Sequence, residues 1–211
     1  MSFHCVDCEN ADHDGPGCIL DWRRPSARRL RGLSELARVM GEEVSALSAA
    51  ERVIVASVKA GGTVYICGNG GSMSQAQHFA AELTGRYKRE RRPIAAVALG
   101  SNPAHMTAVA NDYGYEHVFA RELAAFVLDA PPRGVLICLS TSGTSANVVV
   151  AEGMAHVMGI PVVFITGANA PEALESSCYV VRIPSTDTAI IQEATLSVLH
   201  SICEAIDEEI E

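Results

Sequence analysis

The chain has 211 residues, of which 48% are hydrophobic and 19% charged, a composition typical of one globular domain. Its 16 Lys and Arg residues against 25 Asp and Glu residues give a net charge of −9, which argues against nucleic-acid binding because that requires a basic surface. Such a protein still binds an anion where backbone N–H groups and helix N-termini supply local positive potential.

Membrane and secretory signals are not evident in the sequence. No apolar run reaches the ~18–20 residues that span a bilayer, and the polar, acidic segment 1–18 resembles neither a signal nor a transit peptide. Four of the seven cysteines lie in or beside apolar segments, where a reduced thiol acts as a small hydrophobe: Cys67, Cys138, Cys178 and Cys203. We therefore expect a cytoplasmic protein without a membrane or nucleic-acid partner.

The N-terminal quarter divides into two parts. Residues 1–25 lack apolar periodicity and predict a flexible extension. It contains a C-x₂-C pair, half of a common zinc site, without a second pair at a normal spacing; the candidate donors are His4, Cys5, Cys8, His13 and Cys18. From 26 to 60 the apolar residues follow a helical period, which predicts a helical pair ending at Gly61-Gly62.

The rest of the chain alternates strands and helices. Short apolar runs predict strands at 64–67, 94–99, 135–139, 162–165 and 179–183. Helical patterns lie near 73–86, 103–110, 145–158 and 171–176, and a long one at 188–209. This alternation predicts a three-layer α/β/α sandwich around a five-stranded parallel sheet. Ligands of such sheets bind where strand ends lead into helices.

Two of these strand-to-helix loops are suited to an anion. The first, Cys67 to Ser72, contains Gly68, Asn69, Gly70 and Gly71; its glycines allow close backbone approach, but it lacks the lysine of a nucleotide-binding P-loop. The second, Ser140-Thr141-Ser142-Gly143-Thr144-Ser145, offers five hydroxyls in six residues. An ordinary helix cap needs only one hydroxyl, so the pair of loops predicts a phosphate site.

Four polar residues on the following helices are candidates for chemistry. His78 and Glu82 are four residues apart and share a helix face, so they either bind a metal or stabilise the helix as a surface pair. Gln192 and His200 lie eight residues apart on the last helix, roughly 12 Å along its axis. A histidine on a largely apolar face is often a core residue, and this reading remains open for His200.

The order and spacing of four segments over residues 30–209 resemble the SIS (sugar isomerase) domain family, and within it the bacterial phosphoheptose isomerases. These segments are CGNGGSMSQAQHFAAELTGRY, AVANDYGY, STSGTSANV and TAIIQEATLSVLH. The resemblance implies a flavodoxin-like SIS domain over 26–211. It also implies conversion of D-sedoheptulose 7-phosphate to D-glycero-D-manno-heptose 7-phosphate through an enediol.

The resemblance also implies roles for individual residues. Glu82 matches the catalytic base and His200 its acid/base partner, whereas Asn69 and Asp112 match contacts to the sugar. Phosphate-binding positions correspond to Ser72, Ser140, Thr141, Ser142 and Ser145, beside the loop glycines Gly70 and Gly71. In some members the residues matching His78, Glu82, Gln192 and His200 bind zinc, which implies one zinc per chain. Thr144 and Met73 depart from the family pattern, which usually has Asn and a small or polar residue there.

These residue types suit the chemistry independently of the resemblance. Ketose–aldose isomerisation needs a base near the carbon, an acid/base for the oxygens and a group that polarises the carbonyl; zinc or the amides of Asn69 and Gln192 can supply the last. The separation of Gln192 from His200, and the family's interfacial sites, favour a homotetramer. Two alternatives stay open. One is a non-catalytic SIS module that binds partner proteins, like the replication-initiator-associating relatives; those relatives lack the carboxylate and the final histidine, which are present here as Glu82 and His200. The other is an isomerase of another sugar phosphate.

Overall fold

The computed structural model describes residues 23–42, 44–127 and 133–210. The helical pair predicted at the N-terminus consists of α1 (Arg23–Glu42) and α2 (Ser45–Lys59). Helix α1 begins three residues before the expected start at 26. The predicted flexible extension lies, in its residues 1–22, outside the described residues, as do its candidate metal donors His4, Cys5, Cys8, His13 and Cys18.

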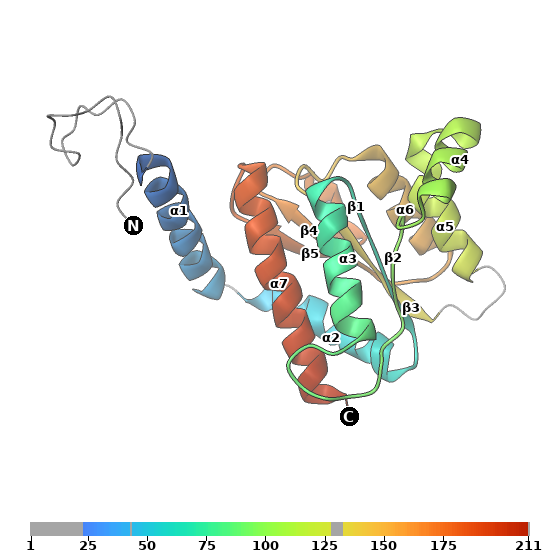
Figure 1. The fold of residues 1–211 in the computed structure, drawn as a ribbon, viewed down its shortest axis with the longest axis horizontal. Coiled ribbons are helices and arrows are strands. Elements are labelled where there is room, and N and C mark those ends of the chain that lie inside the picture. Colours follow the sequence, from blue (N-terminus) through green and yellow to red (C-terminus); the bar gives the residue numbers. More distant parts are fainter. Residues whose placement is uncertain (1–22, 43, 128–132, 211) are drawn as a thin grey trace, which may run out of the picture.

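The five predicted strands form one fully parallel sheet (Figure 1). They are β1 (Thr63–Gly68), β2 (Ala96–Ala98), β3 (Gly134–Ser140), β4 (Val162–Gly167) and β5 (Tyr179–Ile183), in the spatial order β2-β1-β3-β4-β5. Every residue of β3 and β4 is buried, because helices cover both faces of the sheet.

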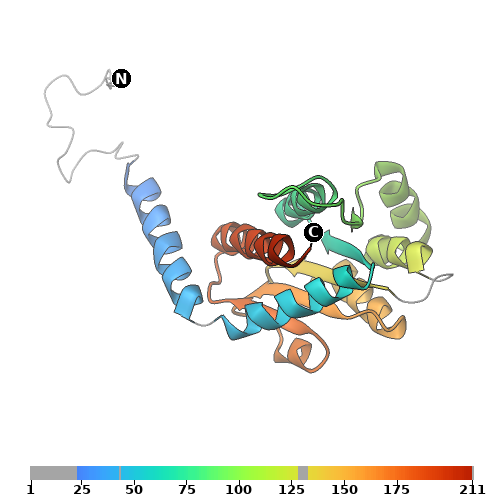
Figure 2. The same cartoon turned by 90° about the horizontal axis from the view of Figure 1, so that it is seen from below.

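The helices form the two outer layers of the predicted sandwich (Figure 2). Side chains from α2, α3 (Gly71–Thr84) and α7 (Thr188–Glu209) pack on one face of the sheet, against Ile66 and Ile137. Those from α4 (Pro103–Tyr113), α5 (Val118–Val127) and α6 (Ala146–Val157) pack on the other, against Leu136 and Phe164. The predicted fold class is therefore confirmed.

Two elements differ from the sequence prediction. Helix α5 was not predicted, although Phe119, Leu123 and Val127 repeat every four residues and are buried. The helix expected near 171–176 is a short 3₁₀ segment, η2 (Glu172–Ser176), which follows Pro171. A second 3₁₀ turn, η1 (Tyr115–His117), follows α4.

Helix α1 extends from the domain, whereas α7 packs in its core. In both views α1 extends away from the rest of the domain (Figures 1 and 2), and an ion pair of 2.7 Å joins its Arg29 to Glu193 of α7. Among the described residues, α7 alone has the length and hydropathy, 1.2 on average, of a membrane span. Its Ile191, Leu199 and Ile206 are buried in the core, as in the core helix of a globular domain.

Candidate active site

The strand order determines where a ligand can bind. From β1 the chain continues to β2 on one side, and β3 then pairs with β1 on the other. The loops after β1 and β3 therefore leave the sheet in opposite senses, and a crevice forms where they diverge. These are the glycine-rich and hydroxyl-rich loops that the sequence singled out.

The glycine-rich loop is held close to the second loop by an amide pair. Asn69 and Asn147, in the first turn of α6, each donate from Nδ2 to the other's Oδ1 at 2.8 Å. Tyr115 donates its hydroxyl to the same Asn69 oxygen at 2.9 Å. A Cβ at Gly68 would lie 2.8 Å from that of Ser72, so the turn requires glycine. Asn69 thus lies in the crevice, already oriented by two partners.

The hydroxyl-rich loop turns at a glycine and brings its hydroxyls together. Gly143 has a φ of +70°, and a Cβ there would lie 2.5 Å from Ala170. The hydroxyls of Ser140 and Ser145 are 3.0 Å apart. Ser145 precedes α6 without capping it through its side chain, and Ser142 accepts from the Thr144 N–H at 3.2 Å. Hydroxyls thus gather at the N-terminus of α6, where an anion is stabilised.

A second group of residues gathers where α3 and α7 run side by side (Figure 1). Nε2 of His78 lies 3.1 Å from Oε1 of Glu82. The ring of His200 lies 5.4 Å from that of His78 and stacks at 5.4 Å on Tyr87. Three of the four predicted metal ligands therefore adjoin, and His200 is half-buried rather than a core histidine.

The fourth, Gln192, lies nearer the start of α3. Its amide is 2.8 Å from the position of a Cβ on Gly71, and Gly71 precedes His78 by roughly 10 Å along the helix axis. Gln75 donates from Nε2 to the backbone carbonyl oxygen of Gln192 at 2.5 Å. Oε1 of Gln75 is buried without a hydrogen-bond partner among the described residues, so it is an acceptor left for a ligand.

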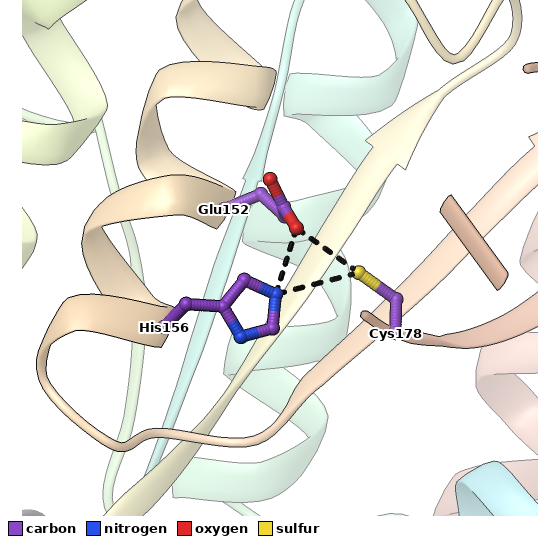
Figure 3. A group of neighbouring side chains, drawn as sticks. All are labelled: Glu152, His156 and Cys178. Carbon is purple, nitrogen blue, oxygen red and sulfur yellow. Dashed lines mark hydrogen bonds and ion pairs between the residues drawn. The ribbon is translucent and has the colours of Figure 1, made fainter. Parts of the chain in front are cut away.

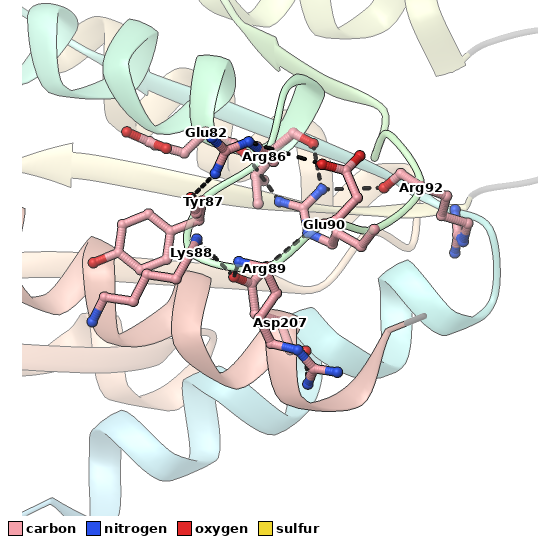
Figure 4. Close-up of polar contacts among 10 residues, drawn as sticks. Glu82, Arg86, Tyr87, Lys88, Arg89, Glu90, Arg92 and Asp207 are labelled. Atoms are coloured by element: carbon pink, nitrogen blue, oxygen red, sulfur yellow. Dashed lines mark hydrogen bonds and ion pairs between the residues drawn. The ribbon is translucent and has the colours of Figure 1, made fainter.

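A buried ion pair holds the end of α3 against α7 (Figure 4). Nε of Arg91 lies 2.8 Å from Oδ1 of Asp207, and the two side chains are 1% and 4% exposed. The same guanidinium donates to the carbonyl oxygens of Glu82, at 2.9 Å, and Leu83, at 3.0 Å. Because one cation binds both helices, it fixes the backbone that carries Glu82 relative to the helix that carries His200.

The electrostatics behind this site favour a charged Asp207 and a neutral Cys203. Burial pushes the pKa of Asp207 upward, but the N–H of Arg89, the Arg91 guanidinium and the N–H of Lys88 outweigh it, so the pKa is lowered. Burial, followed by the nearby Glu82 charge, raises the pKa of the Cys203 thiol to about 12. That thiol stays protonated at neutral pH.

Some residues of the site were not anticipated. Asn147, Tyr115, Gln75 and Tyr87 were missed, because their roles depend on contacts between elements far apart in the sequence. Asp112, on the last turn of α4, is exposed and accepts from Asn111 at 2.8 Å.

Comparisons with known proteins identify the family of the chain. The SIS domain family matches residues 31–167. Phosphoheptose isomerase from Rhodospirillum rubrum is 43% identical over 169 residues, which are 80% of this chain and 88% of that protein. The one from Mycobacterium tuberculosis is 41% identical over 177 residues, which are 84% of each chain.

Solved structures give the same result. Phosphoheptose isomerase from Neisseria gonorrhoeae superposes with a TM-score of 0.80 at 31% identity, over 88% of this chain and 98% of that one. The one from Francisella tularensis has a TM-score of 0.81 at 29% identity and the same coverage. The four relatives named here are phosphoheptose isomerases, and the chain belongs to the SIS domain family.

Proposed function

We propose that this protein isomerises D-sedoheptulose 7-phosphate to D-glycero-D-manno-heptose 7-phosphate. The observation that carries the proposal is the position of Glu82 and His200 on adjacent helices, α3 and α7. Helix α3 begins directly after the glycine-rich loop. A carboxylate and an imidazole are the groups that proton transfer between C1 and C2 requires.

The substrate is oriented by its phosphate. The N-terminus of α6 and the hydroxyls of Ser72, Ser140, Thr141, Ser142 and Ser145 bind that group. Asn69 contacts the sugar, as does Asp112 in the family pattern. Fixing the phosphate far from the reacting carbons brings C1 and C2 to the base without further loss of entropy in the reaction step.

Proton transfer is assigned to two side chains. Oε1 of Glu82 faces His78, so we assign to its second oxygen, Oε2, removal of the proton from C1 and its return to C2. His200 exchanges a proton with the substrate oxygens, and Tyr87, stacked on its ring, holds the imidazole in place. Together they shift the double bond through an enediol.

Zinc suits this group of side chains. Two imidazoles and a carboxylate are common zinc donors, and His78, Glu82 and His200 adjoin across α3 and α7. We propose that they bind one zinc per chain together with Gln192, whose amide must turn away from Gly71 to join them. When bound, zinc would polarise the substrate carbonyl.

The assembly proposed is a homotetramer with active sites at subunit interfaces. Helix α1 extends from the domain and exposes 67% of Leu30 and 37% of Val39. A cavity of about 1020 Å³ lies between α1, α2, β5 and α7, lined among others by Leu33, Leu47 and Val198. A second subunit would cover this apolar surface. Light scattering tests the assembly, and a fully active monomer would contradict it.

A reducing compartment, the cytoplasm, suits the cysteines. Those that the structure describes are free thiols. Sulfur atoms of Cys67 and Cys138, on neighbouring strands, lie 3.9 Å apart as a thiol contact rather than a disulfide.

The decisive experiment is incubation with sedoheptulose 7-phosphate, with and without zinc, followed by detection of an aldose phosphate. Glu82→Gln should bind the substrate but lose turnover by about 10²–10⁴-fold, the usual contribution of a general base. Glu90→Gln, which changes an exposed carboxylate in the loop after α3, is the matched control and should be fully active. Wild-type turnover in Glu82→Gln would remove that residue from the mechanism.

The same assay separates the alternatives. A partner-binding SIS module would give no product from any sugar phosphate. An isomerase of another substrate would turn over a different ketose phosphate and leave sedoheptulose 7-phosphate unchanged.

A further inference from the structure

Three metal-binding side chains converge at a place that the proposed reaction does not use. Glu152 and His156 lie one turn apart on α6, and Cys178 directly precedes β5 (Figure 3). Oε1 of Glu152 is 2.7 Å from Nε2 of His156 and 3.4 Å from Sγ of Cys178. The sulfur and the imidazole nitrogen are 3.9 Å apart. Among the described residues, this is the one group of three His, Cys, Asp or Glu donors so closely gathered.

The spacing is close to that of a zinc site. Zinc binds nitrogen and oxygen at about 2.0 Å and sulfur at about 2.3 Å, so tetrahedral geometry separates the donor atoms by about 3.3–3.6 Å. The three observed separations, from 2.7 to 3.9 Å, bracket those values. Small rotations of side chains that already face one another would admit the ion.

The charge of Glu152 also calls for a cation. Its side chain is only 12% exposed, and its ion-pair partner is His156, which is charged only if protonated. No Lys or Arg pairs with Glu152 in the part of the chain that the structure describes. Ser177 donates its hydroxyl to the same Oε1 at 3.1 Å, but a hydrogen bond brings no positive charge. A largely buried carboxylate without a permanent positive partner is costly, and a divalent ion would provide that charge.

The cluster is remote from the phosphate loops. Helix α6 begins beside Ser145, and His156 lies roughly 15 Å further along its axis. Cys178 lies at the start of β5, whereas the phosphate loops follow the ends of β1 and β3. Because parallel strands share one direction, the starts and ends of the strands lie at opposite edges of the sheet.

We propose that Glu152, His156 and Cys178 form a second divalent-metal site, which takes zinc and leaves the fourth position to solvent. A thiolate together with an imidazole selects zinc over magnesium or calcium, which prefer oxygen donors. The half-exposed imidazole gives the ion a route from solvent. Bound there, the ion would join α6 to the start of β5.

Cobalt(II) distinguishes this site from one made by His78, Glu82, Gln192 and His200, because only a site with a cysteine ligand gives sulfur-to-cobalt charge-transfer absorption. The full chain, reduced and metal-free, should develop that band on titration with cobalt(II). Cys178→Ser should abolish it. The triple variant Cys5→Ser, Cys8→Ser, Cys18→Ser should keep it, which excludes thiols of the N-terminal segment.

Affinity for zinc gives an independent measurement. His156→Gln changes a side chain that is 36% exposed, so the fold should survive even if Cys178→Ser is poorly folded. Competition with a chelating dye should show at least tenfold weaker zinc binding at one site per chain. Isomerase activity should be retained, since the site serves neither the base nor the phosphate. Absence of the band in the wild type, its survival in Cys178→Ser, or unchanged zinc affinity in His156→Gln would overturn the proposal.

Discussion

Removing the charge of Asp207 should destabilise the fold more than any surface change on the same helix. The carboxylate is 4% exposed and pairs with Arg91, which is 1% exposed, at 2.8 Å. It also accepts the backbone N–H groups of Lys88 and Arg89, each at 3.0 Å. Asp207→Asn leaves the guanidinium buried without its counter-charge and turns an amide NH₂ toward donors. Loss of one partner of a buried pair costs about 3–5 kcal/mol.

That magnitude is measurable by equilibrium unfolding in urea at fixed protein concentration. Domains of this kind are stable by about 5–15 kcal/mol, and with an m-value of about 3 kcal/mol/M the midpoint should fall by about 1 M or more. Glu209→Gln is the matched control, because Glu209 lies on the same helix as Asp207 but forms only an exposed ion pair, with Lys59 of α2; this variant should leave the midpoint unchanged. An unchanged midpoint in Asp207→Asn would refute the role given to the buried pair.

Three further predictions concern the loops, the amide and acid stability. Replacing Ser140 and Ser142 together by Ala should raise the substrate concentration for half-maximal turnover at least tenfold, since a hydrogen bond to a charged group contributes about 1.5–3 kcal/mol; unchanged KM would contradict the phosphate assignment. Gln192→Ala removes the amide proposed as a zinc ligand, so turnover should fall while the unfolding midpoint is kept, because that side chain is only half-buried; full activity would remove Gln192 from the site. The lowered pKa of Asp207 gives stability that is complete above its unfolded value of about 3.9 and lost as the pH falls through the folded value; acid unfolding of Asp207→Asn should lack this contribution.

Much of the fold follows from local patterns in the sequence. Continuous apolar runs such as Val135–Leu139 predict buried parallel strands, because only a strand covered on both faces dispenses with polar alternation. Loops rich in glycine or hydroxyls, next to predicted strands, indicate anion binding because the donors and the following helix N-terminus lie within a few residues of one another. Helix α5 was missed although Phe119, Leu123 and Val127 carry a helical period, and η2 was taken for an α-helix because its few residues offer too little period to distinguish the two.

Only the tertiary structure decided which side chains meet. The i,i+4 spacing puts His78 beside Glu82, yet the approach of His200 depends on α7 packing against α3 in the same direction, which no local pattern encodes. The same packing leaves Gln192 beside Gly71, two turns before His78. Arg91 and Asp207, 116 residues apart, read as ordinary charged residues in the sequence. Cys178 likewise joins Glu152 and His156 only because β5 brings it beside α6: side-chain chemistry is local, whereas the convergence of donors is a property of the whole chain.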